Sequence, residues 1–271
     1  MPDCSTSDRQ GTETVYVGVS TKMYLGYADS LEWLTGIRHE VDTRPALAAG
    51  RVVPFVVPSF PVLPAAGRIL EGSPVRLGAQ NCGWADGPWT GEVAPSMLAD
   101  LGVLLVEIGH AERRAHFGET DGIVALKVRA ADDAGLTPLL CVGEDSLGEG
   151  SPRDAAVVVY RQIRAAVGGD WALAARVIVA YEPVWAIGAA EPADTGYVSD
   201  VVSHLRALLA GHGLVGLPVI YGGSAKPGVL PRLSGVSGLF LGRFAHDPAN
   251  FGKVLDEALA LTSKATASSA G

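Results

Sequence analysis

The stretch Arg176-Val-Ile-Val-Ala-Tyr-Glu-Pro-Val-Trp-Ala-Ile-Gly188 decides the fold of this chain. It begins as a short apolar run rich in β-branched residues, which is typical of a buried strand. A buried strand needs no charge at its end, yet Glu182 stands there, directly before Pro183. Because proline restricts the residue before it, the carboxylate leaves the strand in a fixed direction. The segment predicts either a base beneath a lid loop, or an ordinary turn whose glutamate caps the next helix.

Two further apolar runs lead into charged side chains in the same way. The run at 14–19 is followed by Ser20-Thr-Lys22, and the run at 103–108 by Gly109-His110. A lone lysine there is usually solvated and a lone histidine usually caps a helix, but three such ends together favour a functional site. We therefore take Lys22, His110 and Glu182 as candidate catalytic residues.

Apolar runs alternate with helical patterns eight times, and no linker separates them. This alternation predicts an all-parallel sheet, and eight units in roughly 250 residues are what a closed (β/α)8 TIM barrel requires. An open doubly wound sheet would need a glycine-rich turn after the first strand, and Gly18-Val-Ser-Thr-Lys22 is not one. We expect one α/β TIM-barrel domain at 13–262, with disordered segments at 1–12 and 263–271. Strands are expected at 14–19, 52–57, 75–80, 103–108, 137–142, 176–181, 217–221 and 239–241.

The composition limits the possible partners. The chain has 271 residues, of which 48% are hydrophobic, and a net charge of −8 without a basic run, so we expect no nucleic-acid partner. The most apolar stretch, 45–67, contains Arg51 and several prolines, so we expect no membrane span. Three widely spaced cysteines suggest neither disulfides nor a metal site, and the N-terminus has no apolar signal segment. These features predict a cytoplasmic protein.

Glycine-rich turns follow the last two expected strands. In TIM barrels the loops after strands seven and eight commonly bind phosphate through backbone N–H groups. Here Tyr221-Gly-Gly-Ser224 and Gly242-Arg243 occupy those places. We therefore expect Ser224, Gly242 and Arg243 to bind a phosphate, together with Gly188 of the lid.

These motifs resemble those of the triosephosphate isomerase family, in the family's order and over roughly 15–260. The resemblance implies that Glu182 is the base that removes a proton next to a carbonyl, and that His110 is a neutral electrophile. It also implies that Lys22 supplies positive charge, supported by the carboxylate of Glu112. The expected substrate is a small phosphorylated sugar, and no metal or organic cofactor is implied. A projecting loop with Trp84, Trp89 and Thr90 implies a homodimer. The matching pieces are Val-Gly-Val-Ser-Thr-Lys22-Met, Gln80-Asn-Cys82, Trp89-Thr-Gly-Glu-Val-Ala-Pro95, Gly109-His-Ala-Glu-Arg-Arg114, Cys141-Val-Gly-Glu144, the Glu182 stretch and Tyr221-Gly-Gly-Ser224.

Several positions depart from the family pattern. Ser20 stands where the family usually has asparagine, and Arg243 replaces a second glycine. The changes resemble a branch that converts L-erythrulose 1-phosphate to D-erythrulose 4-phosphate, and the shorter serine leaves room for an extra hydroxymethyl group. We favour such a tetrulose phosphate. The alternatives are conversion of D-glyceraldehyde 3-phosphate to dihydroxyacetone phosphate, or a non-catalytic sugar-phosphate sensor. A sensor should have lost one of the three catalytic residues, and all three remain.

Glu107 is an unexpected charge inside the fourth expected strand. It lies one residue out of phase with Ile108. We expect it to point away from the barrel interior toward the helices, where a buried charge requires an ion-pair partner.

Overall fold

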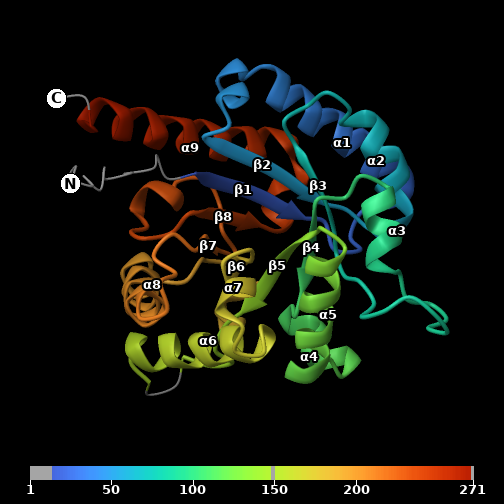
Figure 1. The fold of residues 1–271 in the computed structure, drawn as a ribbon. Helices are drawn as coiled ribbons and strands as arrows, with labels where there is room; N and C mark the ends of the chain where they lie inside the picture. The colour runs from blue at the N-terminus through green and yellow to red at the C-terminus, as the bar shows by residue number, and fades with distance from the viewer. Residues whose placement is uncertain (1–13, 148–149, 270–271) are drawn as a thin grey trace, which may run out of the picture.

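Eight parallel strands form a closed barrel in the computed structural model, which describes residues 14–147 and 150–269, with side chains as far as Ser263. Each strand pairs with the next along the chain, and β8 pairs with β1, where Leu239 lies beside Val17. The TIM barrel predicted from the sequence is therefore confirmed (Figure 1). The strands are β1 (Val15–Ser20), β2 (Val52–Val57), β3 (Arg76–Ala79), β4 (Leu105–Ile108), β5 (Thr137–Val142), β6 (Ile178–Tyr181), β7 (Val219–Tyr221) and β8 (Gly238–Leu241).

Helices surround the barrel and connect successive strands (Figure 1). Several begin with the capping residues that favour a helix start: Thr120 caps α5, Ser151 and Asp154 form a capping box on α6, and Asp194 caps α8. The helices are α1 (Tyr27–Asp42), α2 (Leu63–Ile69), α3 (Pro95–Asp100), α4 (Ala111–Phe117), α5 (Asp121–Asp133), α6 (Pro152–Ala166), α7 (Trp171–Ala174), α8 (Thr195–Ala210) and α9 (Pro248–Ser269).

The strand side chains form two hydrophobic layers, because successive residues of a strand point to opposite faces. Val106 and Ile108 of β4 belong to the layer between the strands and the helices. Leu105 belongs to the inner layer that fills the barrel. The ring of Phe55 occupies the space beside Gly18, where an added Cβ would lie 1.9 Å from that ring. Glycine is therefore required at this point of the barrel interior.

The C-terminal boundary differs from the prediction. Helix α9 runs from Pro248 to Ser269, where a disordered tail was expected from residue 263. Residues 258–269 contain no glycine or proline that would end a helix, which explains its length. The expected disordered segment at 1–12 lies outside the described residues. None of the helices in the described ranges combines the length and the apolar character needed to cross a membrane.

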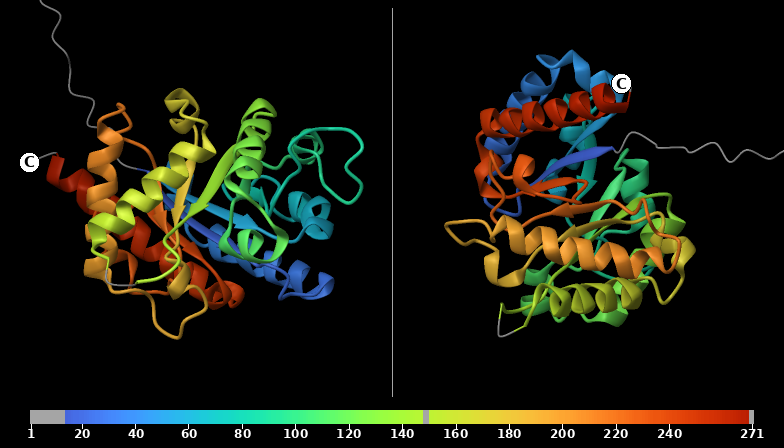
Figure 2. Two further views of the ribbon diagram at one scale, coloured as in Figure 1. Left: turned by 90° about the horizontal axis from the view of Figure 1, so that it is seen from below. Right: turned by 90° about the vertical axis from the view of Figure 1, so that its left-hand side faces the viewer.

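The segment between β3 and α3 stands out from the barrel (Figure 2). Its base is anchored by the buried Asn81 and Cys82, whereas every residue from 85 to 92 is exposed. Within it the rings of Trp84 and Trp89 lie against each other, with centroids 4.9 Å apart. This segment does not line the cavity described below.

Candidate active site

A cavity of about 480 Å³ opens at the C-terminal end of the barrel. Residues that are far apart in sequence meet there, because the ends of β1, β4, β6, β7 and β8 surround one opening. Nine of the candidate residues line this cavity: Ser20, Lys22, His110, Glu112, Glu182, Gly188, Ser224, Gly242 and Arg243. Trp84, Trp89 and Thr90 do not, and belong to the projecting loop.

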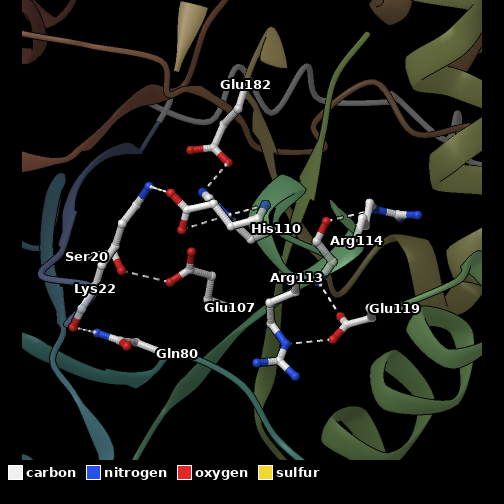
Figure 3. Close-up of polar contacts among 11 residues, drawn as sticks. Ser20, Lys22, Gln80, Glu107, His110, Arg113, Arg114, Glu119 and Glu182 are labelled. Atoms are coloured by element: carbon white, nitrogen blue, oxygen red, sulfur yellow. Dashed lines mark hydrogen bonds and ion pairs between the residues drawn. The ribbon is translucent and has the colours of Figure 1, made fainter. Parts of the chain in front are cut away.

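Glu182 lies one residue beyond β6 and points into the cavity (Figure 3). Its backbone N–H donates to the carbonyl of Val142, which fixes the start of the side chain. The carboxylate is nearly buried, and its Oε2 receives no hydrogen bond within the described residues. A Cβ on Gly222 would lie 2.4 Å from Glu182 Oε1, so glycine at that position leaves space for the carboxylate. Such a desolvated and unpartnered oxygen is suited to accept a proton.

His110 caps α4, and its ring lies beside the Glu182 carboxylate in the cavity (Figure 3). Its Nδ1 accepts a hydrogen bond of 3.2 Å from the backbone N–H of Glu112. Because an accepting ring nitrogen carries no proton, the imidazole is neutral with its proton on Nε2. Nε2 lies 3.7 Å from Glu182 Oε2. A neutral donor and a carboxylate acceptor thus lie side by side on the wall of the cavity, where both can reach one substrate.

Lys22 directs its ammonium group into the cavity from a strained backbone conformation. Its φ angle is +48°, which non-glycine residues rarely adopt. Two side chains hold that conformation, because Ser59 Oγ and Gln80 Nε2 each donate to the Lys22 carbonyl at 2.8 Å. Lys22 Nζ pairs with Glu112 Oε1 at 2.5 Å. Burial raises the pKa of Glu112, but the hydrogen bond and charge of Lys22 outweigh this effect and lower it overall.

The prediction for Glu107 is wrong. Glu107 follows Leu105 on the inner face of β4 and lines the cavity, whereas Ile108 points toward the helices. Its Oε2 accepts a hydrogen bond of 2.9 Å from Ser20 Oγ (Figure 3). The expected ion pair is absent from the described residues, and burial raises the pKa of Glu107 to about 7. The physical reason is the strand phase, which assigns 105 and 107, rather than 108, to the barrel interior.

A group of free backbone N–H donors forms the other side of the cavity. No acceptor among the described residues bonds the N–H groups of Gly188, Ser224 or Gly242. Ser224 has a φ angle of +56°, and its hydroxyl donates to the lid carbonyls of Ala186 and Ala189. The guanidinium of Arg243 lies 5.6 Å above the ring of Tyr24 and lines the same cavity. Free N–H groups beside a guanidinium favour an anion such as phosphate. We call these three N–H groups and the Arg243 guanidinium the anion cradle.

The buried side chains of Glu144 and Tyr221 anchor the two ends of the lid through hydrogen bonds. The sequence predicted a role for neither of them. Glu144 Oε1 accepts from Tyr181 Oη, Trp185 Nε1 and Tyr197 Oη at 3.0–3.2 Å, and thereby joins β6, the lid and α8. Tyr221 Oη donates to the Gly223 carbonyl and accepts from the Ala193 N–H. The only sequence signal for Glu144 is a charge at the end of an apolar run, like that of Glu182. The side chains of Glu144 and Tyr221 therefore bond Trp185 and Ala193, which lie near the two ends of the lid, residues 184–193.

The two cysteines among the described residues do not add a nucleophile to this site. Cys82 and Cys141 are both buried and free. Burial raises the pKa of Cys82 to about 12, and burial with the nearby charges of Glu182 and Glu107 raises that of Cys141. Neither thiol is a nucleophile at neutral pH. Within the described residues, no three His, Cys, Asp or Glu side chains are grouped to hold a metal ion.

The fold and the site define a TIM-barrel enzyme that places a carboxylate and a neutral imidazole beside an anion-binding cradle. A family model described as triosephosphate isomerase matches residues 15–258. The chain is 46% identical to the L-erythrulose-1-phosphate isomerase of Pectobacterium atrosepticum over 92% of this chain and 97% of that protein. It is 37% identical to the protein of the same name from Mycolicibacterium smegmatis, over 96% and 98% respectively.

A solved structure supports the same assignment. The triosephosphate isomerase of Bartonella henselae is 31% identical, with a TM-score of 0.74 over 89% of this chain and 98% of that one. The chain belongs to the triosephosphate isomerase family and is an isomerase.

Proposed function

We propose that the chain interconverts L-erythrulose 1-phosphate and D-erythrulose 4-phosphate. The observation that carries the reaction type is the facing pair of Glu182 Oε2 and His110 Nε2, 3.7 Å apart beside the anion cradle. The names of the relatives from Pectobacterium atrosepticum and Mycolicibacterium smegmatis favour the four-carbon substrate over a triose phosphate.

Glu182 acts as the base. In L-erythrulose 1-phosphate the carbonyl is at C2, and C3 carries a hydrogen and a hydroxyl group. Glu182 takes the C3 proton, the electron pair of that bond forms the C2–C3 double bond, and the carbonyl electrons move to O2. Return of the proton to C2, while O3 becomes the carbonyl oxygen, gives erythrulose 4-phosphate. The product is an isomer, so the balance requires no external oxidant or reductant.

His110 and Lys22 act on the oxygens of the enediolate. The Nε2–H of His110 donates to the oxygen that gains charge and carries the proton from O3 to O2. Lys22 lowers the energy of the same anion through its positive charge. Its ion pair with Glu112 holds the ammonium group in the cavity. The three side chains therefore act on one intermediate.

The phosphate is assigned to the cradle of free N–H groups at Gly188, Ser224 and Gly242, with the guanidinium of Arg243 beside them. Closure of the lid over the bound phosphate would remove water from Glu182. Because a carboxylate loses solvation when water is excluded, it becomes a stronger base.

We also propose a homodimer in the cytoplasm, formed through the projecting loop. Trp89 is 42% exposed and Thr90 is exposed, and Trp84 packs against Trp89. Exposed aromatic side chains on a loop that leaves the barrel are typical of a protein–protein interface. In the dimer this loop would reach the Lys22 region of the partner subunit.

An assay of the purified chain on two substrates tests the function. L-erythrulose 1-phosphate should give a kcat/KM roughly tenfold or more above that of D-glyceraldehyde 3-phosphate. A preference for the triose phosphate would assign the alternative substrate. Failure to turn over either one, with both still bound, would assign the sensor.

A further inference from the structure

Glu107 is a buried carboxylate of the cavity that the proposed reaction does not use. It is 4% exposed, and Ser20 Oγ supplies the one hydrogen bond that its side chain receives within the described residues. That bond reaches Oε2, so Oε1 is without a partner there. The cavity lining includes Glu107, and Figure 3 shows its second oxygen turned away from Ser20.

Folding stability does not explain this carboxylate. Two other acidic side chains near the site have cations: Glu119 accepts from Lys127 at 2.9 Å and Arg113 at 2.7 Å, and Glu112 pairs with Lys22. Glu107 forms no ion pair with any described residue, and a buried carboxylate with one neutral donor destabilises a fold. A leucine or valine would fill the barrel at a lower cost. A group retained at such a cost is best explained by a ligand contact.

The barrel places Glu107 opposite the anion cradle. Strand β4 lies four positions from β8 in the ring of eight strands, so the two stand on opposite sides. Gly242 and Arg243 follow β8, whereas Glu107 is on β4. A substrate with its phosphate in the cradle and its reacting carbons beside His110 and Glu182 directs its other end toward Ser20 and Glu107.

A triose phosphate and a tetrulose phosphate differ at that end. A triose phosphate ends at the reacting carbons. A tetrulose phosphate continues by one hydroxymethyl group, which needs volume and a polar partner. Ser20 and Glu107 line this part of the cavity, and Glu107 Oε1 is available as the partner.

We propose that Glu107 binds the terminal hydroxyl group of a four-carbon ketose phosphate and thereby sets the length of the substrate. The inference rests on the proposed function and names the specificity residue for it. Ser20 is the positioning residue, since its hydrogen bond turns Oε2 aside and leaves Oε1 toward the cavity. An ionised Glu107 accepts the hydroxyl proton, and a protonated one donates to the hydroxyl oxygen, so either form makes the contact.

The contact discriminates because a triose phosphate has no terminal hydroxyl group for Oε1, which is then left without a partner from the ligand. Sites that bind a substrate hydroxyl reject an analogue without it far more strongly than an apolar pocket rejects a missing methylene. Glu107 should therefore act against the shorter substrate as well as for the longer one.

Glu107→Leu and Glu107→Gln test the assignment, with Glu71→Gln as an exposed control. The leucine variant should lower kcat/KM on L-erythrulose 1-phosphate by roughly 10- to 100-fold. On D-glyceraldehyde 3-phosphate it should leave kcat/KM unchanged or raise it. The glutamine variant keeps a hydrogen-bonding group and should lose less than the leucine variant. Equal losses on both substrates, or an unchanged ratio, overturn the proposal.

Inhibition of the unmodified chain gives a second test that needs no variant to fold. Erythritol 4-phosphate carries the additional hydroxylated carbon, and glycerol 3-phosphate does not. Erythritol 4-phosphate should bind at least roughly tenfold more tightly than glycerol 3-phosphate. Equal binding of the two inhibitors overturns the proposal. If the unmodified chain does not turn over L-erythrulose 1-phosphate, the proposed function fails. If the unmodified chain turns over L-erythrulose 1-phosphate but Glu107→Leu keeps the same ratio of kcat/KM values for the two substrates, only the assignment of Glu107 fails.

Discussion

The pKa of Glu107 predicts how stability changes with pH when this side chain is replaced. In the folded chain burial raises it from an ordinary value of 4.5 to about 7. The nearby charge of Glu182 adds to this increase in pKa, whereas the hydrogen bond from Ser20 and the charge of Lys22 oppose it. Between these two pKa values the folded state binds more protons than the unfolded state. The free energy of unfolding therefore falls as pH rises through this window.

The magnitude follows from the two pKa values. At about 1.4 kcal/mol for each unit of pKa, ionising Glu107 costs the folded state about 3 kcal/mol once the pH exceeds 7. Most of this cost arises between pH 5 and pH 8. Glutamine does not titrate, so the free energy of unfolding of Glu107→Gln should rise by about 2 to 3 kcal/mol relative to that of the unmodified chain between pH 5 and pH 8. In a chain of this size the gain corresponds to about 5 to 10 °C in Tm.

Urea unfolding of both proteins at pH 5, 6, 7 and 8 measures the effect. The protein concentration must be the same throughout, because association would change the apparent stability. Any difference between the two proteins that does not depend on pH is a constant offset, so the slope of the difference against pH is the diagnostic quantity. For the Glu71→Gln control, the difference in free energy of unfolding from the unmodified chain should not change with pH. If the difference for Glu107→Gln does not change with pH either, the assigned pKa is refuted.

Four further predictions concern the site and the assembly. Glu182→Gln should lower kcat by roughly 100- to 10,000-fold with little change in substrate binding, measured by steady-state kinetics; near-normal turnover would assign the base elsewhere. Arg243→Ala should weaken inhibition by inorganic phosphate by roughly tenfold, and unchanged inhibition would exclude a phosphate contact. Ser20→Asn should narrow or reverse the preference for a tetrulose phosphate, and an unchanged ratio of kcat/KM values would show that Ser20 does not set it. Trp89→Ala should shift the dimer toward monomer in light scattering, whereas a fully active monomer of the unmodified chain would contradict the assembly.

The barrel and its main site residues could be predicted because they depend on local patterns. Lys22, His110 and Glu182 each follow an apolar run, and parallel strands bring such ends to one opening. Some strands begin one or two residues later than predicted, because the apolar run starts before the first residue that pairs with a neighbouring strand. Arg76 and Leu105 are examples.

The orientation of Glu107 could not be predicted from its own strand. A four-residue strand preceded by two apolar residues does not reveal which alternate set faces inward, since both faces of a barrel strand are buried. The register between strands decides it, and that depends on long-range pairing. The lid anchors at Glu144 and Tyr221 were missed for a related reason. Their partners lie on other elements, 41 residues away for Trp185 and 28 for Ala193.

The strained backbone of Lys22 has a consequence for any attempt to make this protein more heat-resistant. A non-glycine residue at positive φ stores about 1 to 3 kcal/mol, which glycine or asparagine at that position would partly release. A screen for thermal stability alone would thus favour replacements of Lys22 and discard the ammonium group of the cavity. Library designs that aim at thermostability should hold position 22 fixed, together with the Ser59 and Gln80 side chains that keep it in place.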